Sequence, residues 1–184
     1  MAMATYLESG LRLDLPDGQH FRFADLPTYR TLSSYRLKEM DFAWLDGGKL
    51  FLLEVRSYAQ VTETLTGAHF VPAKGQPAPF RYEALIDKVT DSLLMLLAAW
   101  AGSASGQALR EGLPEGAKSR LPLKLVIAVD LPAKLAIHLQ GLRDSLNARL
   151  RGRMALADVR NVVLIDYARL VADPRFSAFI RLQA

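Results

Sequence analysis

Residues 40–58 read MDFAWLDGGKLFLLEVRSY and carry the strongest structural signal in the chain. Two runs of mixed apolar and polar residues flank Gly47 and Gly48. A two-residue hairpin loop of the common type needs positive φ at both central positions, and glycine adopts this conformation without strain. The stretch therefore predicts a tight β-hairpin.

The position of the loop fixes which residues face one another across the hairpin. Asp46 pairs with Lys49, and counting outward places Asp41 directly opposite Glu54. Side chains alternate between the two faces of a strand. One face, expected to pack in the core, collects Met40, Phe42, Trp44, Phe51, Leu53 and Val55. The other face collects Glu39, Asp41, Ala43, Leu52, Glu54 and Arg56.

Two opposed carboxylates need charge compensation. Directly opposed residues have Cβ atoms about 4.5–5.5 Å apart, and like charges at that distance destabilise a sheet. Either a cation lies between them or one carboxyl stays protonated. Magnesium binds through one or two carboxylates and keeps waters for substrate phosphates. We therefore predict a divalent-metal site at Asp41 and Glu54, with Arg56 on the same face to hold a phosphate.

A simpler interpretation of these charges stays open at this point. Arg56 falls opposite Glu39 and diagonal to Asp41. The acidic and basic side chains would then form a solvated cross-strand ion-pair patch, which contributes little to stability.

The rest of the chain predicts an α/β fold: a mixed sheet flanked by helices, with an added N-terminal β-hairpin, in a single domain over residues 1–184. The first hairpin would pair residues 11–15 with residues 20–23. Near-continuous apolar runs predict buried strands at 123–129 and 161–165. We expect helices at 25–36, 82–100, 133–153 and 174–182, and irregular connections at 61–80 and 102–121.

Composition narrows the classes of function. The chain has no cysteine, which excludes disulfide scaffolds, thiolate zinc sites and cysteine nucleophiles. Residues 1–12 contain Glu8 and no apolar block, so we expect no signal peptide. The longest apolar run, 93–101, is about half of what a membrane helix needs. We expect a cytoplasmic protein with no membrane partner, and a net charge of +4 that permits a polyanionic partner without requiring one.

The spacing of Asp41, twelve further residues, and then Glu54, Val55 and Arg56 resembles the motif of the PD-(D/E)XK nuclease superfamily. In that motif an acid lies at the end of one strand and an E-x-K triplet lies on the next. The similarity covers roughly residues 36–130. It implies a restriction-endonuclease-like fold with a core at about residues 36–166.

The resemblance also implies a function. Asp41 and Glu54 would bind Mg²⁺ or Mn²⁺, with the Val55 carbonyl as a backbone ligand. The activity would be hydrolysis of phosphodiester bonds in nucleic acid, DNA more often than RNA, in bacterial defence or DNA repair. The chain has no room for a separate recognition domain, so specificity would come from loops, a homodimer or a partner protein.

Two residues depart from the superfamily motif. Met40 stands where the motif has proline, and Arg56 stands where it has the catalytic lysine. Arginine binds phosphate well but is a poor proton carrier. Lys88 on the following helix is the candidate replacement, unless it is a solvated residue paired with Asp87 or Asp91. The candidate catalytic set is Asp41, Glu54, Arg56 and Lys88.

Basic residues outside the hairpin define a candidate nucleic-acid surface. Lys134, His138, Arg149 and Arg153 lie opposite a leucine stripe on the 133–153 helix, and Lys74 lies in the loop after the hairpin. They could follow a phosphate backbone, or simply form a solvated helix face. The candidate nucleic-acid-binding set is Arg56, Lys74, Arg149 and Arg153.

Two rival functions follow from the same observations. Arginine at the lysine position fits a domain that keeps the fold, has lost the reaction, and serves as a nucleic-acid- or protein-binding assembly module. A metal-dependent enzyme acting on a small phosphoester would use the same pair of acids. Metal titration separates the first rival from a nuclease, and a nucleic-acid binding assay separates the second.

Overall fold

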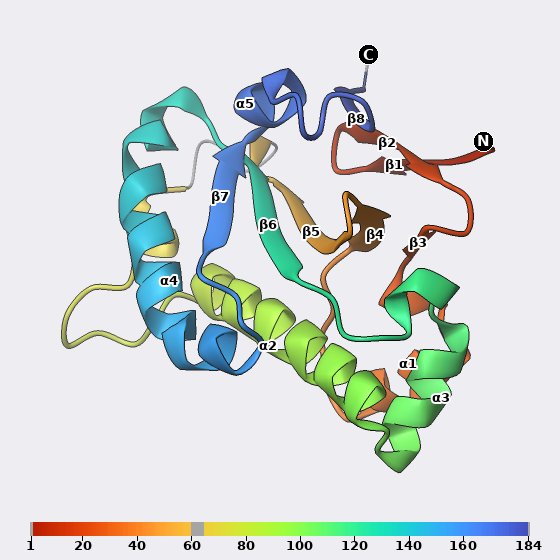
Figure 1. Cartoon of the computed structure of the whole chain (residues 1–184). Helices are drawn as coiled ribbons and strands as arrows, with labels where there is room; N and C mark the ends of the chain where they lie inside the picture. The colour runs from red at the N-terminus through yellow and green to blue at the C-terminus, as the bar shows by residue number, and fades with distance from the viewer. Residues whose placement is uncertain (1, 60–64, 184) are drawn as a thin grey trace.

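The structure is a computed structural model that describes residues 2–59 and 65–183. Figure 1 shows a five-stranded sheet between helices α2 and α4 on one side and a small three-stranded sheet with α5 on the other. The strands are β1 (Met3–Glu8), β2 (Leu11–Pro16), β3 (His20–Phe21), β4 (Phe42–Asp46), β5 (Lys49–Ser57), β6 (Leu123–Asp130), β7 (Val162–Asp166) and β8 (Ile180–Leu182). The α-helices are α1 (Pro27–Ser34), α2 (Phe80–Ala101), α3 (Ala104–Gly112), α4 (Leu139–Leu156) and α5 (Tyr167–Ala172).

The central sheet has the order β3-β4-β5-β6-β7 and is mixed. Strands β3, β4 and β5 pair antiparallel, whereas β5, β6 and β7 pair parallel. Parallel neighbours need a crossover connection, and α2 and α4 lie within the two crossovers. The predicted α/β class and the mixed sheet flanked by helices are confirmed.

The β4–β5 hairpin has the predicted register. Gly47 and Gly48 have φ of 53° and 71°, the positive values that a two-residue turn of this kind requires. The pairs Asp46–Lys49, Trp44–Phe51 and Phe42–Leu53 follow from that turn.

Both faces of the hairpin are buried. Phe42, Trp44, Phe51, Leu53 and Val55 pack with the apolar residues of β2, α5 and β8 in one cluster. The opposite face packs under α2 and α4 in a second cluster. The charged residues at the end of β5 therefore belong to a largely buried surface, because a parallel sheet is covered on both sides.

Met40 departs from the predicted face. It is buried with the cluster under α2, not with Phe42 and Trp44. The reason is that β4 begins at Phe42, so the strict alternation does not extend back to Met40.

The predicted pairing of residues 11–15 with 20–23 is wrong. The N-terminal hairpin is formed by β1 and β2 instead, and β2 also pairs with β8. β3 pairs with β4 at the edge of the central sheet. A six-residue partner at Met3–Glu8 offers β2 more ladder hydrogen bonds than the two residues of β3 can provide.

The C-terminal helix predicted at 174–182 is also wrong. This region forms turns and the short strand β8, with Phe176 and Ile180 buried. The short helix α5 comes earlier than expected. Strand β8 completes the small sheet because β2 otherwise presents an unpaired edge.

The supposed linker at 102–121 contains helix α3. Gly106 is essential to this packing, because a Cβ there would lie 2.0 Å from the carbonyl oxygen of Ala98 on α2. The glycine that suggested a linker in fact permits two helices to approach closely.

The remaining connections match the expectations in part. The predicted helix 133–153 begins as a 3₁₀ segment, Ala133–His138, before α4. In the irregular connection 61–80, residues 61–64 lie outside the described part of the chain, and Gly67–His69 forms a 3₁₀ turn. Within residues 2–59 and 65–183, no helix combines the length and the apolar character needed to cross a bilayer.

Candidate active site

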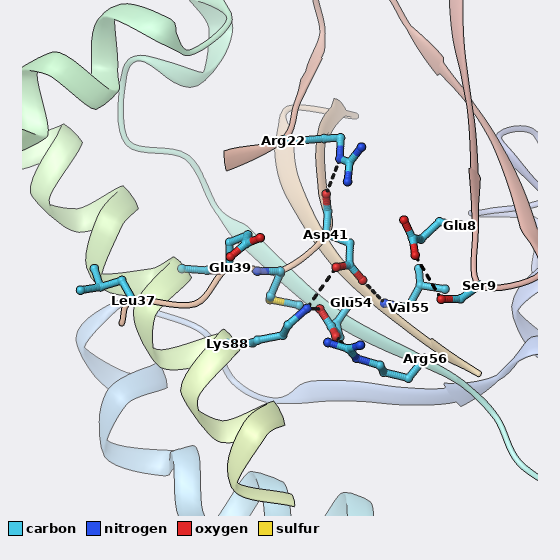
Figure 2. Close-up of polar contacts among 12 residues, drawn as sticks. Glu8, Ser9, Arg22, Leu37, Glu39, Asp41, Glu54, Val55, Arg56 and Lys88 are labelled. Carbon is cyan, nitrogen blue, oxygen red and sulfur yellow. Dashed lines mark hydrogen bonds and ion pairs between the residues drawn. The ribbon is translucent and has the colours of Figure 1, made fainter. Parts of the chain in front are cut away.

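Four charged side chains from three elements meet where β4 begins and β5 nears its end. Asp41 directly precedes β4, Glu54 and Arg56 lie on β5, and Lys88 projects from the first half of α2. Figure 2 shows the Lys88 side chain extending from its helix to both carboxylates. The carboxyl ends of sheet strands are where α/β proteins usually bind ligands.

Lys88 bridges the two acids. Its Nζ lies 3.1 Å from Asp41 Oδ1 and 2.8 Å from Glu54 Oε2. Arg56 Nε donates to the other Glu54 oxygen, Oε1, at 2.6 Å. Asp41 and Glu54 are thus neighbours, one position beyond the last ladder pair Phe42–Leu53, and the Lys88 ammonium lies within reach of both.

The solvated cross-strand patch does not form. Glu54 is 0 % exposed, and Arg56 pairs with it and not with Glu39. Glu39 instead accepts a hydrogen bond from the Tyr29 hydroxyl. The charges therefore form a cluster around one buried carboxylate, with Asp41 and Lys88 partly buried and Arg56 42 % exposed.

Asp41 is held by two backbone contacts. The Val55 N–H donates to Asp41 Oδ2 at 2.8 Å, and Arg22 Nε donates to the Asp41 carbonyl at 3.3 Å. The N–H and C=O of one strand residue project to the same side, so the Val55 carbonyl lies on the β4 side of β5. This orientation is the one that a backbone metal ligand at Val55 needs.

Helix α2 positions the segment that leads into β4. The backbone N–H of Lys38 donates to Asp91 Oδ2 at 2.9 Å, and that of Met40 donates to Ser92 Oγ at 2.8 Å. Lys38 Nζ also pairs with Asp87 at 2.7 Å. Asp87 and Asp91 therefore serve to dock this segment on α2, and Lys88 on the same helix reaches the carboxylates.

Replacing Ser92 by alanine is expected to lower the free energy of unfolding by about 1–3 kcal/mol, because the Met40 N–H would lose its partner in a buried position. Urea unfolding measures the loss. The control is Thr90→Ala on the same helix, since the Thr90 hydroxyl donates only to the Ile86 carbonyl of its own helix. Equal stability of the Ser92 variant and wild type would show that this hydrogen bond does not hold Met40.

Burial raises the pKa of Glu54 to about 8, and the neighbouring Asp41 charge adds to this effect. Lys88 and Arg56 act in the opposite direction, because each favours the ionised carboxylate. The folded protein therefore holds a proton on Glu54 at pH values where an exposed glutamate has lost it.

This raised pKa predicts a pH-dependent stability. Between about pH 4.5 and 8 the folded state binds a proton that the unfolded state has released, so stability falls as pH rises, by up to about 1.4 kcal/mol per pH unit. The variant Glu54→Gln should lack this part of the slope. Urea unfolding of both proteins at pH 5, 6, 7 and 8 measures the difference, and parallel curves would contradict the assignment.

A divalent cation between Asp41 and Glu54 would have few protein ligands. Each carboxylate has one oxygen bound to a protein donor and the other directed to Lys88 Nζ, so a positive charge is already accommodated there. Among the described residues no group of three or more His, Asp or Glu side chains could share an ion. Two carboxylates with water and phosphate oxygens are the arrangement that Mg²⁺ accepts.

A cavity of about 400 Å³ adjoins this cluster. It is lined by Lys38, Arg56, Tyr58, Phe80, Arg81, Ala84, Leu85 and Lys88. Its charged lining residues are all cations, so the cavity is suited to an anionic ligand next to the acids.

The other candidate nucleic-acid residues lie elsewhere. Lys74 is exposed in the loop before α2, and Arg149 and Arg153 are exposed on α4. None of these three lines the cavity. Lys38 and Arg81, which were not among the residues predicted from sequence, do line it. The spacing from Arg81 to Lys88 is seven residues, or two helical turns, which would have placed Arg81 on the face of α2 that carries Lys88.

Comparison with protein-family models, with curated proteins and with solved structures finds no match to this chain. The function is therefore inferred from the geometry of Asp41, Glu54, Arg56 and Lys88 and from the cavity beside them.

Proposed function

We propose that this protein is a metal-dependent phosphodiesterase that hydrolyses nucleic acid, with DNA as the first substrate to test, on a restriction-endonuclease-like fold. One observation carries the proposal: the carboxylates of Asp41 and Glu54 are adjacent and share a cation, Lys88, next to a cation-lined cavity. Metal-dependent phosphoryl transfer needs carboxylates that can hold the ion and, beside them, a site that binds the phosphate.

The order of residues along the chain supports the same proposal. An acid before β4 and a Glu-x-Arg triplet on β5 have the spacing of the PD-(D/E)XK motif, and α2 supplies a lysine that the triplet lacks. In this proposal Asp41, Glu54 and the Val55 carbonyl hold Mg²⁺ or Mn²⁺. When bound, such an ion would supply Lewis-acid chemistry: a lower pKa for a water and stabilisation of charge on a phosphoryl group.

The protein's own cations have separate roles. Arg56 is held by Glu54 through Nε and stays charged at any relevant pH, so it neutralises charge that develops on the phosphoryl oxygens. Lys88 takes the place of the motif lysine. Its Nζ lies beside both acids and can donate a proton there. The buried position of Glu54 excludes water from one side of the cluster and strengthens these interactions.

A second candidate function is a binding module that keeps the fold without the reaction. The observation in its favour is that Lys88 already compensates both carboxylates, so the folded protein needs no metal for charge balance. The module would bind nucleic acid or a protein through the same cation-lined cavity.

The experiment that tests the proposal is a cleavage assay with purified protein. Single-stranded DNA, duplex DNA and RNA are each incubated with Mg²⁺, with Mn²⁺ or with EDTA. We expect shortened products with either metal and none with EDTA. Intact substrates under every metal condition, with nucleic-acid binding retained, would reject the nuclease and leave the binding module.

A further inference from the structure

We propose that the cavity beside the carboxylates binds one unpaired nucleotide, so that the substrate strand is single-stranded at the site. This inference rests on the proposed function for its choice of ligand, and it adds the class of substrate. The cavity volume, about 400 Å³, lies within the range of about 300–1,000 Å³ found for small-molecule sites.

The charged half of the lining is suited to a phosphate. Arg56 donates to Glu54 through Nε. Among the described residues, neither of its two terminal nitrogens has an ion-pair partner. Arg81 has no ion pair within the part of the chain that the structure describes, although it lines the same cavity. Two guanidinium groups with free donors can bind phosphate oxygens bidentately.

The apolar half of the lining is suited to a base. Tyr58, Phe80, Ala84 and Leu85 supply it, and Phe80 is 80 % exposed despite being the first residue of α2. An aromatic side chain beside a cationic groove is the arrangement on which single-stranded nucleic acids stack their bases. In a duplex both faces of a base are covered by its neighbours, so only an unpaired base can lie flat on Phe80.

The test is fluorescence anisotropy with a labelled 12-nucleotide DNA strand, alone or annealed to its complement, in EDTA so that no cleavage occurs. We expect the single strand to bind more tightly than the duplex. Phe80→Ala should weaken single-strand binding about tenfold and leave duplex binding nearly unchanged. The control is Leu94→Ala on the same helix, since Leu94 is also an exposed apolar residue, at 57 %, but does not line the cavity.

A salt series tests the phosphate contact. Arg81→Gln should reduce the dependence of log Kd on log salt concentration by about 0.7 for a single strand, the value expected for one lost phosphate contact. Arg153→Gln on α4 is the matched control. A reduced slope in the Arg153 variant, with an unchanged slope in the Arg81 variant, would place the strand on α4 and overturn the proposal.

The outcomes separate this inference from the proposed function. Equal binding of single strand and duplex, or wild-type affinity in both Phe80→Ala and Arg81→Gln, would overturn the inference even if the protein cleaves DNA. Selective single-strand binding through Phe80 and Arg81 would support it even if no cleavage occurs with any metal. Thermal melts of each variant check that it remains folded.

Discussion

Asp41→Asn is expected to abolish metal-dependent cleavage, with a fall in kcat/KM of about 10³-fold or more. The variant keeps an oxygen that can accept the hydrogen bond from the Val55 N–H, but it loses the acceptor that faces Lys88 Nζ. It removes one of the two negative charges that would hold the ion. A metal supplies several kcal/mol of transition-state stabilisation, and each 1.4 kcal/mol is worth about tenfold in rate.

The matched control for this variant is Asp46→Asn at the other end of β4. Asp46 is exposed beside the turn and pairs across the hairpin with Lys49, far along the strand from the carboxylate pair. Its cleavage rate should equal that of wild type. If Asp41→Asn retains cleavage while folded, or if the two variants lose activity equally, Asp41 does not hold the ion.

Lys88→Met is expected to destabilise the protein by about 3 kcal/mol at pH 9, above the pKa of about 8 that Glu54 has in wild type, because the variant lacks the cation that favours the ionised carboxylate. The loss should be smaller at pH 6, because Glu54 then carries a proton and needs no partner. Saturating Mg²⁺ should stabilise this variant more than wild type, since the ion would no longer compete with the ammonium. Urea unfolding at both pH values, with and without Mg²⁺, measures all three effects.

The control for the lysine variant is Lys38→Met. Lys38 pairs with Asp87, and both side chains are close to half exposed, at 40 % and 45 %. Exposed pairs of this kind contribute about 0–1 kcal/mol to stability. We therefore expect only a small change in the free energy of unfolding, and no effect of Mg²⁺ on it. A Lys88 variant that behaves like the Lys38 variant would mean that the bridging contacts contribute nothing to charge compensation.

The hairpin could be predicted from sequence because its information is local. Gly47 and Gly48 define the turn, and the turn defines a register that runs to Phe42–Leu53, one position short of Asp41 and Glu54. No contact with a distant segment is needed for this step. The face of Met40 was predicted wrongly because the sequence does not show where a strand begins.

The partners of the flanking strands could not be predicted in the same way. Alternation predicts that residues 11–15 form a strand, but it does not show whether β1, β3 or β8 pairs with that strand. The choice of β1 and β8 depends on chain ends more than 150 residues apart. Likewise, Gly106 suggests a loop until the neighbouring helix is seen to pass within contact distance of it.

The role of Lys88 could be predicted from the sequence only in part. Its place on the helix after the hairpin predicts that it faces either the sheet or solvent. The decision depends on Glu54, which is fully buried once β6 pairs with β5 and α2 covers the sheet. When Glu54 is ionised, its buried carboxylate needs a cation, and Lys88 on α2 supplies it.

The presence of a metal between the two acids is tested most directly by X-ray diffraction from crystals soaked in Mn²⁺, recorded where manganese scatters anomalously. The proposed function predicts an anomalous peak bounded by oxygens of Asp41 and Glu54, with the Lys88 ammonium moved away from its bridging position. A map with no peak at saturating Mn²⁺, and with Lys88 still in contact with both carboxylates, would contradict it.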